Sequence, residues 1–341
     1  MSDFEHVFEK PPEGAAADWT IPQNWSAYTE VEHQTWDTLY ARQMKILPGR
    51  ACEAFLNGLK ALDLNAGGIP DFDVINPKLQ ALTGWTVVCV PGLVPDEVFF
   101  DHLANRRFVS GQFIRKPDQL DYLQEPDIFH DVFGHVPMLT DPDFAAYMEA
   151  YGKGGQRAAS MGMLPNLARL YWYTVEFGLM KEAGALRIYG AGIVSSATES
   201  VFALDDPSPN RIGFDLERVM RTLYRIDDFQ QAYFVIDSFE DLLRQTVETD
   251  FAPLYAEIAA LPGAKAEQLR VHQSWTPPEA TYPNGTHVCE LEIDPGTGAT
   301  AILNYVVVDD FGVTLNPIML QGQVHGGAAQ GIGQALMEEI R

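Results

Sequence analysis

The chain has 341 residues and a formal net charge of −24, with 46% hydrophobic and 11% aromatic residues. This acidity argues against nucleic acid or an anionic membrane as a partner, since both bind basic patches. The length and composition allow one large domain plus a smaller one. Three widely spaced cysteines, Cys52, Cys89 and Cys289, indicate a reducing cytoplasm and no disulfide framework. The sequence lacks a secretion-signal pattern and an apolar run long enough to span a bilayer.

The first part of the chain is predicted to be mainly helical. Residues 1 to 25 are polar and carry Pro11, Pro12 and Gly14, which predicts a poorly ordered arm. Apolar residues at three- and four-residue spacing predict helices within 26 to 62, and a short helix is expected at 77 to 83. Residues 85 to 90 are apolar and rich in β-branched side chains, which predicts a strand. A loop at 91 to 95 precedes a helix, and short strands are expected at 107 to 109 and 112 to 114.

The middle of the chain continues the helical pattern. A helix is predicted from Pro142 to Tyr151, a mobile loop at 152 to 155, and helices at 156 to 160 and 164 to 181. Further helices are expected at 213 to 224 and 239 to 261. The expected fold class is therefore mainly α with short strands.

Two histidines lie five residues apart, at His130 and His135, in the stretch PDIFHDVFGHVP. In a regular helix such positions point about 140° apart, at roughly 3.6 residues per turn. Both can reach one metal only if the helix ends or distorts between them, and Gly134 and Pro137 are the residues expected to end it. The spacing also differs from the i,i+4 pair of zinc proteases.

Glu176 is a single carboxylate in the almost wholly apolar run from Leu170 to Met180. Burying an ionised carboxylate is costly unless it is paired or binds a metal. A basic neighbour, Arg169, Lys181 or Arg187, could pair with it instead, or the acid could be buried in its neutral form. Two imidazoles and one carboxylate form the ligand set of non-haem Fe(II) sites with open positions, and the same set could bind zinc.

The chain resembles the pterin-dependent aromatic amino acid hydroxylases, in particular the bacterial enzymes that act on phenylalanine. The resemblance covers about residues 15 to 262. It is carried in order by QFIR at 112 to 115, EPDIFHD at 125 to 131, GHVP at 134 to 137, YW at 171 and 172, TVEFGL at 174 to 179 and YGAGIVSS at 189 to 196. It implies a catalytic domain at 26 to 262 with Fe(II) held by His130, His135 and Glu176.

The resemblance also implies a pterin site, with the ring stacked on Phe99. The residues expected there are Gly92, Leu93, Val94, Phe99, Asp131, Ala168 and Tyr171. Without the resemblance, an aromatic residue at a helix start most often packs in the core.

A substrate site is implied as well, with Arg115 holding the amino acid carboxylate through two parallel hydrogen bonds. An ion pair with Asp118 or Asp121 is the alternative for this arginine. Ser195 is expected to hydrogen-bond an iron-binding imidazole. The complete implied set is Arg115, Pro126, Trp172, Phe177, Gly192, Ser195, Ser196 and Ile226.

The C-terminal part has a different pattern. A linker is expected at 263 to 280, followed at 281 to 341 by a β-hairpin and a Gly- and Ala-rich helix. The run GQVHGGAAQGIG at 322 to 333 resembles part of the molybdopterin-binding subunit of the xanthine dehydrogenase and aldehyde oxidase family. The remaining segments of that family's cofactor site are missing, so no molybdopterin chemistry is expected.

Together these features predict a phenylalanine 4-monooxygenase that uses Fe(II), a tetrahydropterin and O2 to convert L-phenylalanine to L-tyrosine. The resemblance places the substrate preference on Ile226, where it implies an acidic residue in tyrosine hydroxylases and an apolar one in phenylalanine hydroxylases. An apolar wall offers no partner to a tyrosine hydroxyl. Alternatives are a hydroxylase of tryptophan or another aromatic amino acid, a zinc hydrolase, and an inactive fusion product. We expect a cytoplasmic monomer that binds neither nucleic acid nor membrane.

Overall fold

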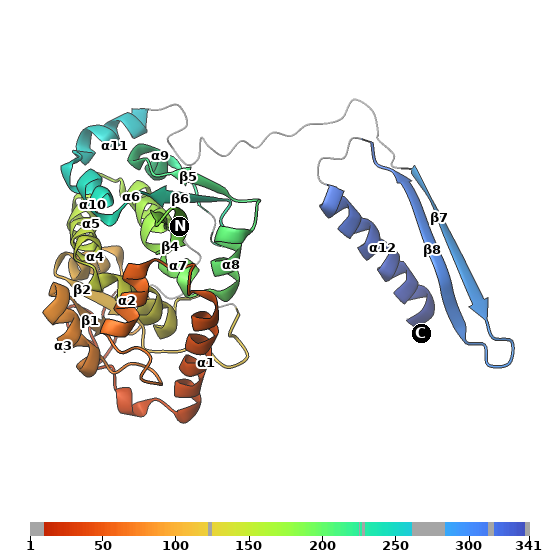
Figure 1. The fold of residues 1–341 in the computed structure, drawn as a ribbon, viewed down its shortest axis with the longest axis horizontal. Helices are drawn as coiled ribbons and strands as arrows, with labels where there is room; N and C mark the ends of the chain where they lie inside the picture. The colour runs from red at the N-terminus through yellow and green to blue at the C-terminus, as the bar shows by residue number, and fades with distance from the viewer. Residues whose placement is uncertain are drawn as a thin grey trace. The chain divides into compact units, whose positions relative to one another are not determined.

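The computed structural model describes residues 10–121, 125–224, 226, 229–260, 284–312 and 317–337. The chain divides into two compact units, residues 1–270 and 271–341 (Figure 1). The linker expected at 263 to 280 lies outside the described residues. No helix among the described residues is long and apolar enough to cross a membrane.

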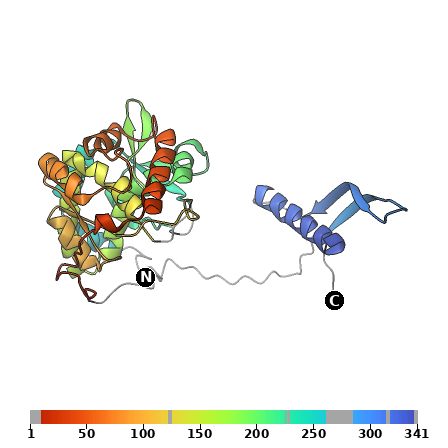
Figure 2. The same cartoon turned by 90° about the horizontal axis from the view of Figure 1, so that it is seen from below.

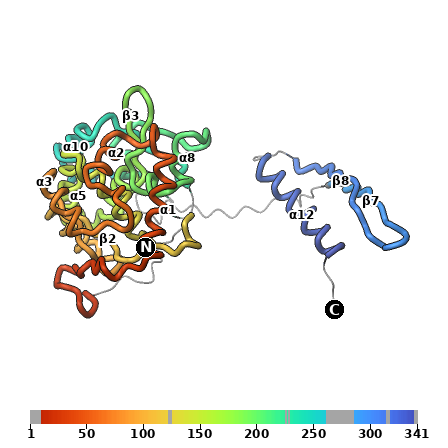
Figure 3. The backbone as a smooth tube through the Cα atoms, turned by 60° about the horizontal axis from the view of Figure 1, so that its bottom comes forward, coloured from red at the N-terminus to blue at the C-terminus, as the bar shows by residue number. Residues whose placement is uncertain are grey.

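The first unit is mainly helical, as the sequence predicts. Its α-helices are α1 (Glu30–Ile46), α2 (Glu53–Ala61), α3 (Phe72–Thr83), α4 (Asp96–Ala104), α5 (Pro142–Ser160), α6 (Leu164–Tyr171), α7 (Ala191–Val194), α8 (Ala197–Asp205), α9 (Leu216–Arg221), α10 (Phe239–Glu248) and α11 (Phe251–Ala260). Short 3-10 helices are η1 (Trp25–Ala27) and η3 (Val136–Thr140), and two π-helices are η2 (Phe129–His135) and η4 (Trp172–Glu176). The longest early helix, α1, begins with a capping box between Thr29 and Glu32 and packs beside α8 (Figure 3).

Two small sheets join these helices. Strands β1 (Thr86–Cys89) and β2 (Arg107–Ser110) pair in parallel, with Val87 opposite Phe108. The other sheet has the order β4-β3-β6-β5, in which only the β3–β4 pair is antiparallel. Its strands are β3 (Leu179–Glu182), β4 (Ala185–Ile188), β5 (Asn210–Gly213) and β6 (Ala232–Ile236). The strand expected at 112 to 114 is absent, and the helix expected to reach residue 181 ends at Glu176.

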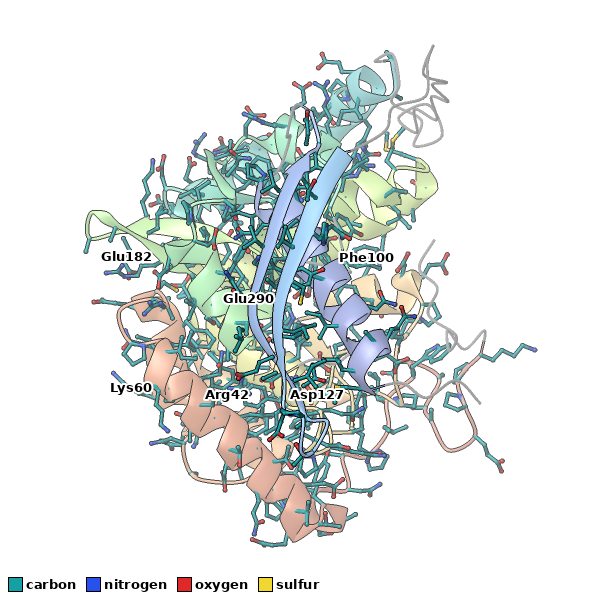
Figure 4. The ribbon with its side chains drawn as sticks, turned by 90° about the vertical axis from the view of Figure 1, so that its right-hand side faces the viewer. Arg42, Lys60, Phe100, Asp127, Glu182 and Glu290 are labelled. Carbon is teal, nitrogen blue, oxygen red and sulfur yellow. The ribbon has the colours of Figure 1, made fainter. Side chains whose placement is uncertain are left out.

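Helix α5 is continuous through the segment in which the sequence predicts a mobile loop. Gly152 and Gly155 allow α4 to pack closely against it: a Cβ at Gly152 would lie 2.4 Å from the Ala104 nitrogen, and one at Gly155 would lie 2.0 Å from the Phe100 ring. The Phe100 ring, whose residue is labelled in Figure 4, occupies the space that a side chain at Gly155 would need. The glycines therefore serve helix packing here, and the loop prediction is wrong.

Residues 10–25 also differ from the poorly ordered arm that the sequence predicts. Trp19 is 4% exposed, and the backbone N–H of Ile21 donates to the carbonyl of Cys89 over 2.9 Å. Trp25 donates its indole N–H to the carbonyl of Ile69 over 2.6 Å. This part of the chain is thus docked on the first unit by burial and by hydrogen bonds.

The second unit contains the predicted hairpin and helix. Strands β7 (Asn284–Ile293) and β8 (Thr300–Asp310) pair antiparallel, and α12 (Pro317–Met337) follows. Helix α12 lies next to the hairpin within this unit (Figure 2), and a groove between β8 and α12 is lined by residues of both, among them Val307 and Val324.

Candidate metal centre and surrounding site

The three predicted metal ligands converge in the structure. The ligand atoms of His130, His135 and Glu176 all lie within 4.8 Å of one another. The Nε2 atoms of the two histidines are 3.3 Å apart, and Oε1 of Glu176 lies 3.2 Å from Nε2 of His135. This is the only such cluster of three or more candidate ligands within the described residues. It leaves room for one ion between two imidazoles and a carboxylate.

A local change of helix type brings the histidines together. Residues Phe129–His135 form a π-helix, whose i→i+5 hydrogen bonds place residues five apart near one face. Gly134 does not end this helix: a Cβ there would lie 3.1 Å from the Ala191 carbonyl oxygen, so glycine lets α7 approach. Pro137 is the second residue of the following 3-10 helix, which begins at Val136. The predicted distortion is therefore present, although its form was not expected.

Glu176 is placed by the second π-helix, η4. The neighbouring chain approaches closely, since a Cβ at Gly190 would lie 2.4 Å from the Glu176 carbonyl oxygen. The small residues at 190 to 192 therefore serve packing against the Glu176 backbone. Neither Arg169 nor Arg187 pairs with the Glu176 carboxylate, because Arg169 donates to the carbonyl of Met220 and Arg187 to that of Leu186.

The protonation states at the cluster suit a cation. Burial lowers the pKa of His130 to about 4, although the nearby Glu176 carboxylate opposes this shift. Burial by itself would raise the pKa of Glu176, but the adjacent imidazoles more than offset it, so this pKa lies below its usual range. A neutral imidazole and an ionised carboxylate are the forms that bind metal.

The Ser195 hydroxyl lies against the ring nitrogen of His130 that faces away from the cluster. Its hydroxyl donates to the carbonyl of Ala191 over 2.7 Å and lies 3.0 Å from Nδ1 of His130. Because the single hydroxyl proton is used on Ala191, Nδ1 of His130 must donate to Ser195. The lone pair of Nε2 is then directed to the metal position.

Arg115 forms a buried ion pair, but with Asp127 and not with Asp118 or Asp121. Its Nε and Nη2 atoms each lie 2.8 Å from one oxygen of Asp127, which is labelled in Figure 4. Asp127 is fully buried, and its Oδ1 also accepts the backbone N–H of His130 over 3.0 Å. Burial would raise the pKa of Asp127, but the Arg115 hydrogen bonds outweigh it and lower the pKa. Asp127 thus positions the start of the π-helix, a role that sequence reasoning missed although the residue lies within the EPDIFHD motif.

Two of the residues expected at the pterin site, Phe99 and Tyr171, connect to His135 through ring contacts. The ring of Phe99 meets that of Tyr171 edge-on, with centroids 5.7 Å apart, and Tyr171 lies 6.2 Å from the ring of His135. Ala168 lies on α6, three residues before Tyr171, and Gly92, Leu93 and Val94 form the half-buried loop between β1 and α4. Asp131 accepts the backbone N–H of Gly111 over 2.8 Å, and burial raises its pKa to about 7.

Most of the residues expected at the substrate site have structural partners. Trp172 stacks on Tyr224 at 4.3 Å, packs against Phe177 at 4.8 Å, and donates to the Gln230 side chain. A Cβ at Gly192 would lie 2.9 Å from the ring of Phe177. The remaining expected positions are Ser196, which caps α8, Pro126, which is exposed, and Ile226, which is 60% exposed.

Comparisons with known proteins agree with this geometry. Residues 19–253 match the family described as biopterin-dependent aromatic amino acid hydroxylase. The chain is 71% identical over 251 residues to a phenylalanine-4-hydroxylase of Caulobacter vibrioides, covering 74% of this chain and 85% of the relative. It is 62% identical to one from Ralstonia nicotianae, covering 72% and 78%. The iron- and phenylalanine-bound crystal structure of the Chromobacterium violaceum phenylalanine hydroxylase is similar, with a TM-score of 0.69, 57% identity, and coverage of 72% of this chain and 89% of that one.

The C-terminal part has a separate match. Residues 224–341 match the family described as molybdopterin cofactor-binding domain, and this match overlaps the first one over residues 224–253.

Proposed function

The chain belongs to the biopterin-dependent aromatic amino acid hydroxylases, and we propose that it hydroxylates L-phenylalanine to L-tyrosine with Fe(II), a tetrahydropterin and O2. One observation carries the proposal: the ligand atoms of His130, His135 and Glu176 converge within 4.8 Å in a chain 71% identical to a phenylalanine-4-hydroxylase.

The residues present fit an iron ion. Two imidazoles and one carboxylate suit Fe(II) and leave positions for other ligands. The hydrogen bond from His130 to Ser195 holds the ring with Nε2 facing the cluster, and the bond from its backbone to Asp127 holds the peptide. When bound, the iron and pterin activate O2, and the pterin supplies two electrons.

The protein's own part in the reaction is to bind, orient and exclude water. His130, His135 and Glu176 would hold the iron, and Phe99 and Tyr171 would hold the pterin ring beside it. Trp172 and Phe177 supply an aromatic surface for the substrate ring. Arg115 would bind the substrate carboxylate with donors left over from its Asp127 pair, whose burial keeps the guanidinium in place.

Product analysis tests the proposal directly. The purified full-length chain is supplied with Fe(II), 6-methyltetrahydropterin and O2, and with phenylalanine, tyrosine or tryptophan in separate reactions. We expect tyrosine from phenylalanine, in step with pterin-dependent oxygen uptake. The absence of pterin-dependent oxygen uptake would instead favour a zinc hydrolase that uses the same three ligands.

Phenylalanine is the proposed substrate over tyrosine. A pocket with no partner for the phenol would leave that hydroxyl unpaired, which costs about 1–3 kcal/mol. Ile226 remains the candidate for this discrimination, and exchange to Asp offers a gain-of-function test. A kcat/KM for tyrosine above that for phenylalanine in the unmodified chain would refute the preference.

We infer that the C-terminal unit is a fragment related to molybdopterin-binding domains and performs no molybdenum chemistry. The family match to residues 224–341 supports the relationship. Metal analysis of the purified chain should find iron and no molybdenum. We further infer a cytoplasmic location, supported by the free, buried thiols of Cys52 and Cys89, and fractionation of expressing cells would test it.

A further inference from the structure

Residues Asp18–Ile21, here called the N-terminal strap, bind three elements around the proposed pterin loop at Gly92–Val94. We propose that the N-terminal strap positions this loop and Phe99, and thereby sets the affinity for the pterin. The inference rests on the proposed function, because that function places the pterin at this loop.

The strap holds the strand that enters the loop. Ile21 forms an isolated antiparallel bridge with Cys89, the last residue of β1, through a hydrogen bond of 2.9 Å. The next residue, Val90, donates to the carbonyl of Ser110 over 2.9 Å. The chain is therefore fixed on both sides of Cys89 immediately before the loop begins.

The strap also holds the helix that leaves the loop. His102 on α4 is 1% exposed, and its Nε2 donates to the carbonyl of Asp18 over 2.7 Å. His102 lies three residues after Phe99, so the two side chains are neighbours on the surface of α4. The strap thus restrains the helix within one turn of the aromatic ring proposed to stack on the pterin.

A third contact ties these two restraints together. Arg107 on β2 binds the Asp18 carboxylate over 2.8 Å and lies 3.6 Å from the carboxylate of Asp101 on α4. The Asp18 side chain also accepts the Thr20 hydroxyl over 2.7 Å, which fixes the shape of the strap itself.

The loop depends on its ends because its own residues supply little restraint. Gly92, Leu93 and Val94 form no hydrogen bond within the part of the chain that the structure describes. Their positions therefore follow from where β1 ends and where α4 begins. Loosening the strap should let the loop and Phe99 sample positions that bind pterin less well, while the iron ligands on η2 and η4 stay in place.

Three substitutions in the iron-loaded, full-length chain test this role. His102→Leu removes the hydrogen bond to the strap, His102→Gln offers an amide donor to the same carbonyl, and Asp18→Asn weakens the Arg107 ion pair. The matched control is Asp237→Asn, which removes another ion pair, between Asp237 and Lys181 on β3. The measurements are the KM and calorimetric Kd for 6-methyltetrahydropterin, the KM for phenylalanine, kcat, iron content and melting temperature.

We expect His102→Leu to raise the KM and Kd for the pterin about three- to tenfold, the effect of losing one hydrogen bond. The kcat at saturating pterin, the phenylalanine KM and the iron content should stay close to those of the unmodified chain. Asp18→Asn should show a smaller rise, His102→Gln should recover most of the affinity, and Asp237→Asn should show none.

Two results would overturn the role of the strap. One is a lower melting temperature with unchanged pterin KM and Kd, which indicates a purely structural contact. The other is an equal rise in the phenylalanine KM, which indicates general loosening of the site. Should His102→Leu fail to fold, the half-buried Asp18→Asn variant provides the test by itself. If the unmodified chain shows no pterin-dependent turnover, the proposed function itself is overturned. This outcome can be told apart from the two results that would overturn the role of the strap.

Discussion

Nδ1 of His130 donates a hydrogen bond to the Ser195 hydroxyl over 3.0 Å, and that hydroxyl donates in turn to the carbonyl of Ala191. The order of donors fixes the neutral tautomer in which Nε2 is free to bind metal. Outer partners of this kind orient metal-binding histidines and raise their basicity.

Replacing Ser195 with Ala should therefore weaken iron binding while leaving all three ligands in place. We expect about a tenfold rise in the Kd for Fe(II), measured by anaerobic titration. Ser200→Ala is the matched control, because Ser200 is also buried and bonds only backbone carbonyls, those of Ile193 and Ser196. Equal losses in both variants would show that the effect is one of packing.

The ligands themselves should be indispensable for turnover. His130→Ala, His135→Ala and Glu176→Ala should each abolish tyrosine formation and reduce bound iron, since each removes one of the three ligands. Circular dichroism should show a retained fold, because each substitution removes a polar side chain of the cluster and none of the buried hydrophobic residues of the core. Normal turnover in any of the three variants would remove that residue from the ligand set.

The glycines of α5 allow a sharp test of helix packing. Gly155→Ala places a methyl group 2.0 Å from the Phe100 ring, whereas a Cβ at Gly154 meets nothing within 4 Å. Overpacking costs about 1–3 kcal/mol, so Gly155→Ala should lower the melting temperature. Gly154→Ala should raise it, because alanine favours a helix over glycine by about 1 kcal/mol. The packing argument fails if both substitutions shift stability in the same direction.

The sequence predicts the metal ligands better than the shape of the backbone that holds them. Ligand identity follows from residue types and motifs, and both persist in any local geometry. The π-helical form of η2 does not follow from them, and neither does the close approach of α7 at Gly134, which only the tertiary structure shows. The same limit explains the wrong loop prediction at 152 to 155: a glycine-rich run predicts a break unless the partner helix that needs the space is known.

The contacts between residues far apart along the chain could not be predicted from the sequence either. Arg115 has acidic residues nearby at Asp118 and Asp121, yet its partner is Asp127, which is buried and bridges to the His130 backbone. The docking of the N-terminal strap depends on Cys89, His102 and Arg107, far from it along the chain. Local polarity predicts an arm there, and only tertiary contacts reveal otherwise.

The buried imidazole at the metal site gives the iron-free protein a defined pH dependence. Burial lowers the pKa of His130 to about 4, against about 6.5 in an unfolded chain. Between these values the unfolded state binds a proton on this histidine that the folded state does not, so the contribution of His130 to the free energy of unfolding falls as the pH decreases.

Asp131, whose pKa burial raises to about 7, acts in the opposite direction over this range in both proteins, so the test compares variants. From pH 7.5 to pH 5.5 we expect the urea midpoint of the iron-free unmodified chain to fall relative to that of His130→Asn. The lowered pKa of Glu176 also makes the free energy of unfolding fall as the pH decreases. That effect operates only below the ordinary pKa of 4.5, outside the range tested. An identical pH dependence with and without His130 would contradict the assignment of a buried, neutral imidazole.

The last prediction concerns the C-terminal unit, which should contribute nothing to hydroxylation. A two-stranded hairpin is marginally stable alone in water. One face of β8 lines the groove beside α12, through Tyr305 and Val307. On the opposite face Val306 is 44% exposed and Val308 68% exposed, and Val288 on β7 is 57% exposed.

Such a strand, apolar on its open face and unpaired along its edge, favours pairing between molecules. A chain ending at Gly263 should therefore be as active as the whole chain and more soluble. Val306→Lys together with Val308→Lys in the full-length chain is the matched variant: it should improve solubility without changing kcat or either KM. Light scattering against concentration measures the first property and tyrosine formation the second. Protease resistance of residues 284–337, combined with a lower melting temperature or slower pterin-dependent turnover after truncation, would show instead that this unit is an integral part of the enzyme.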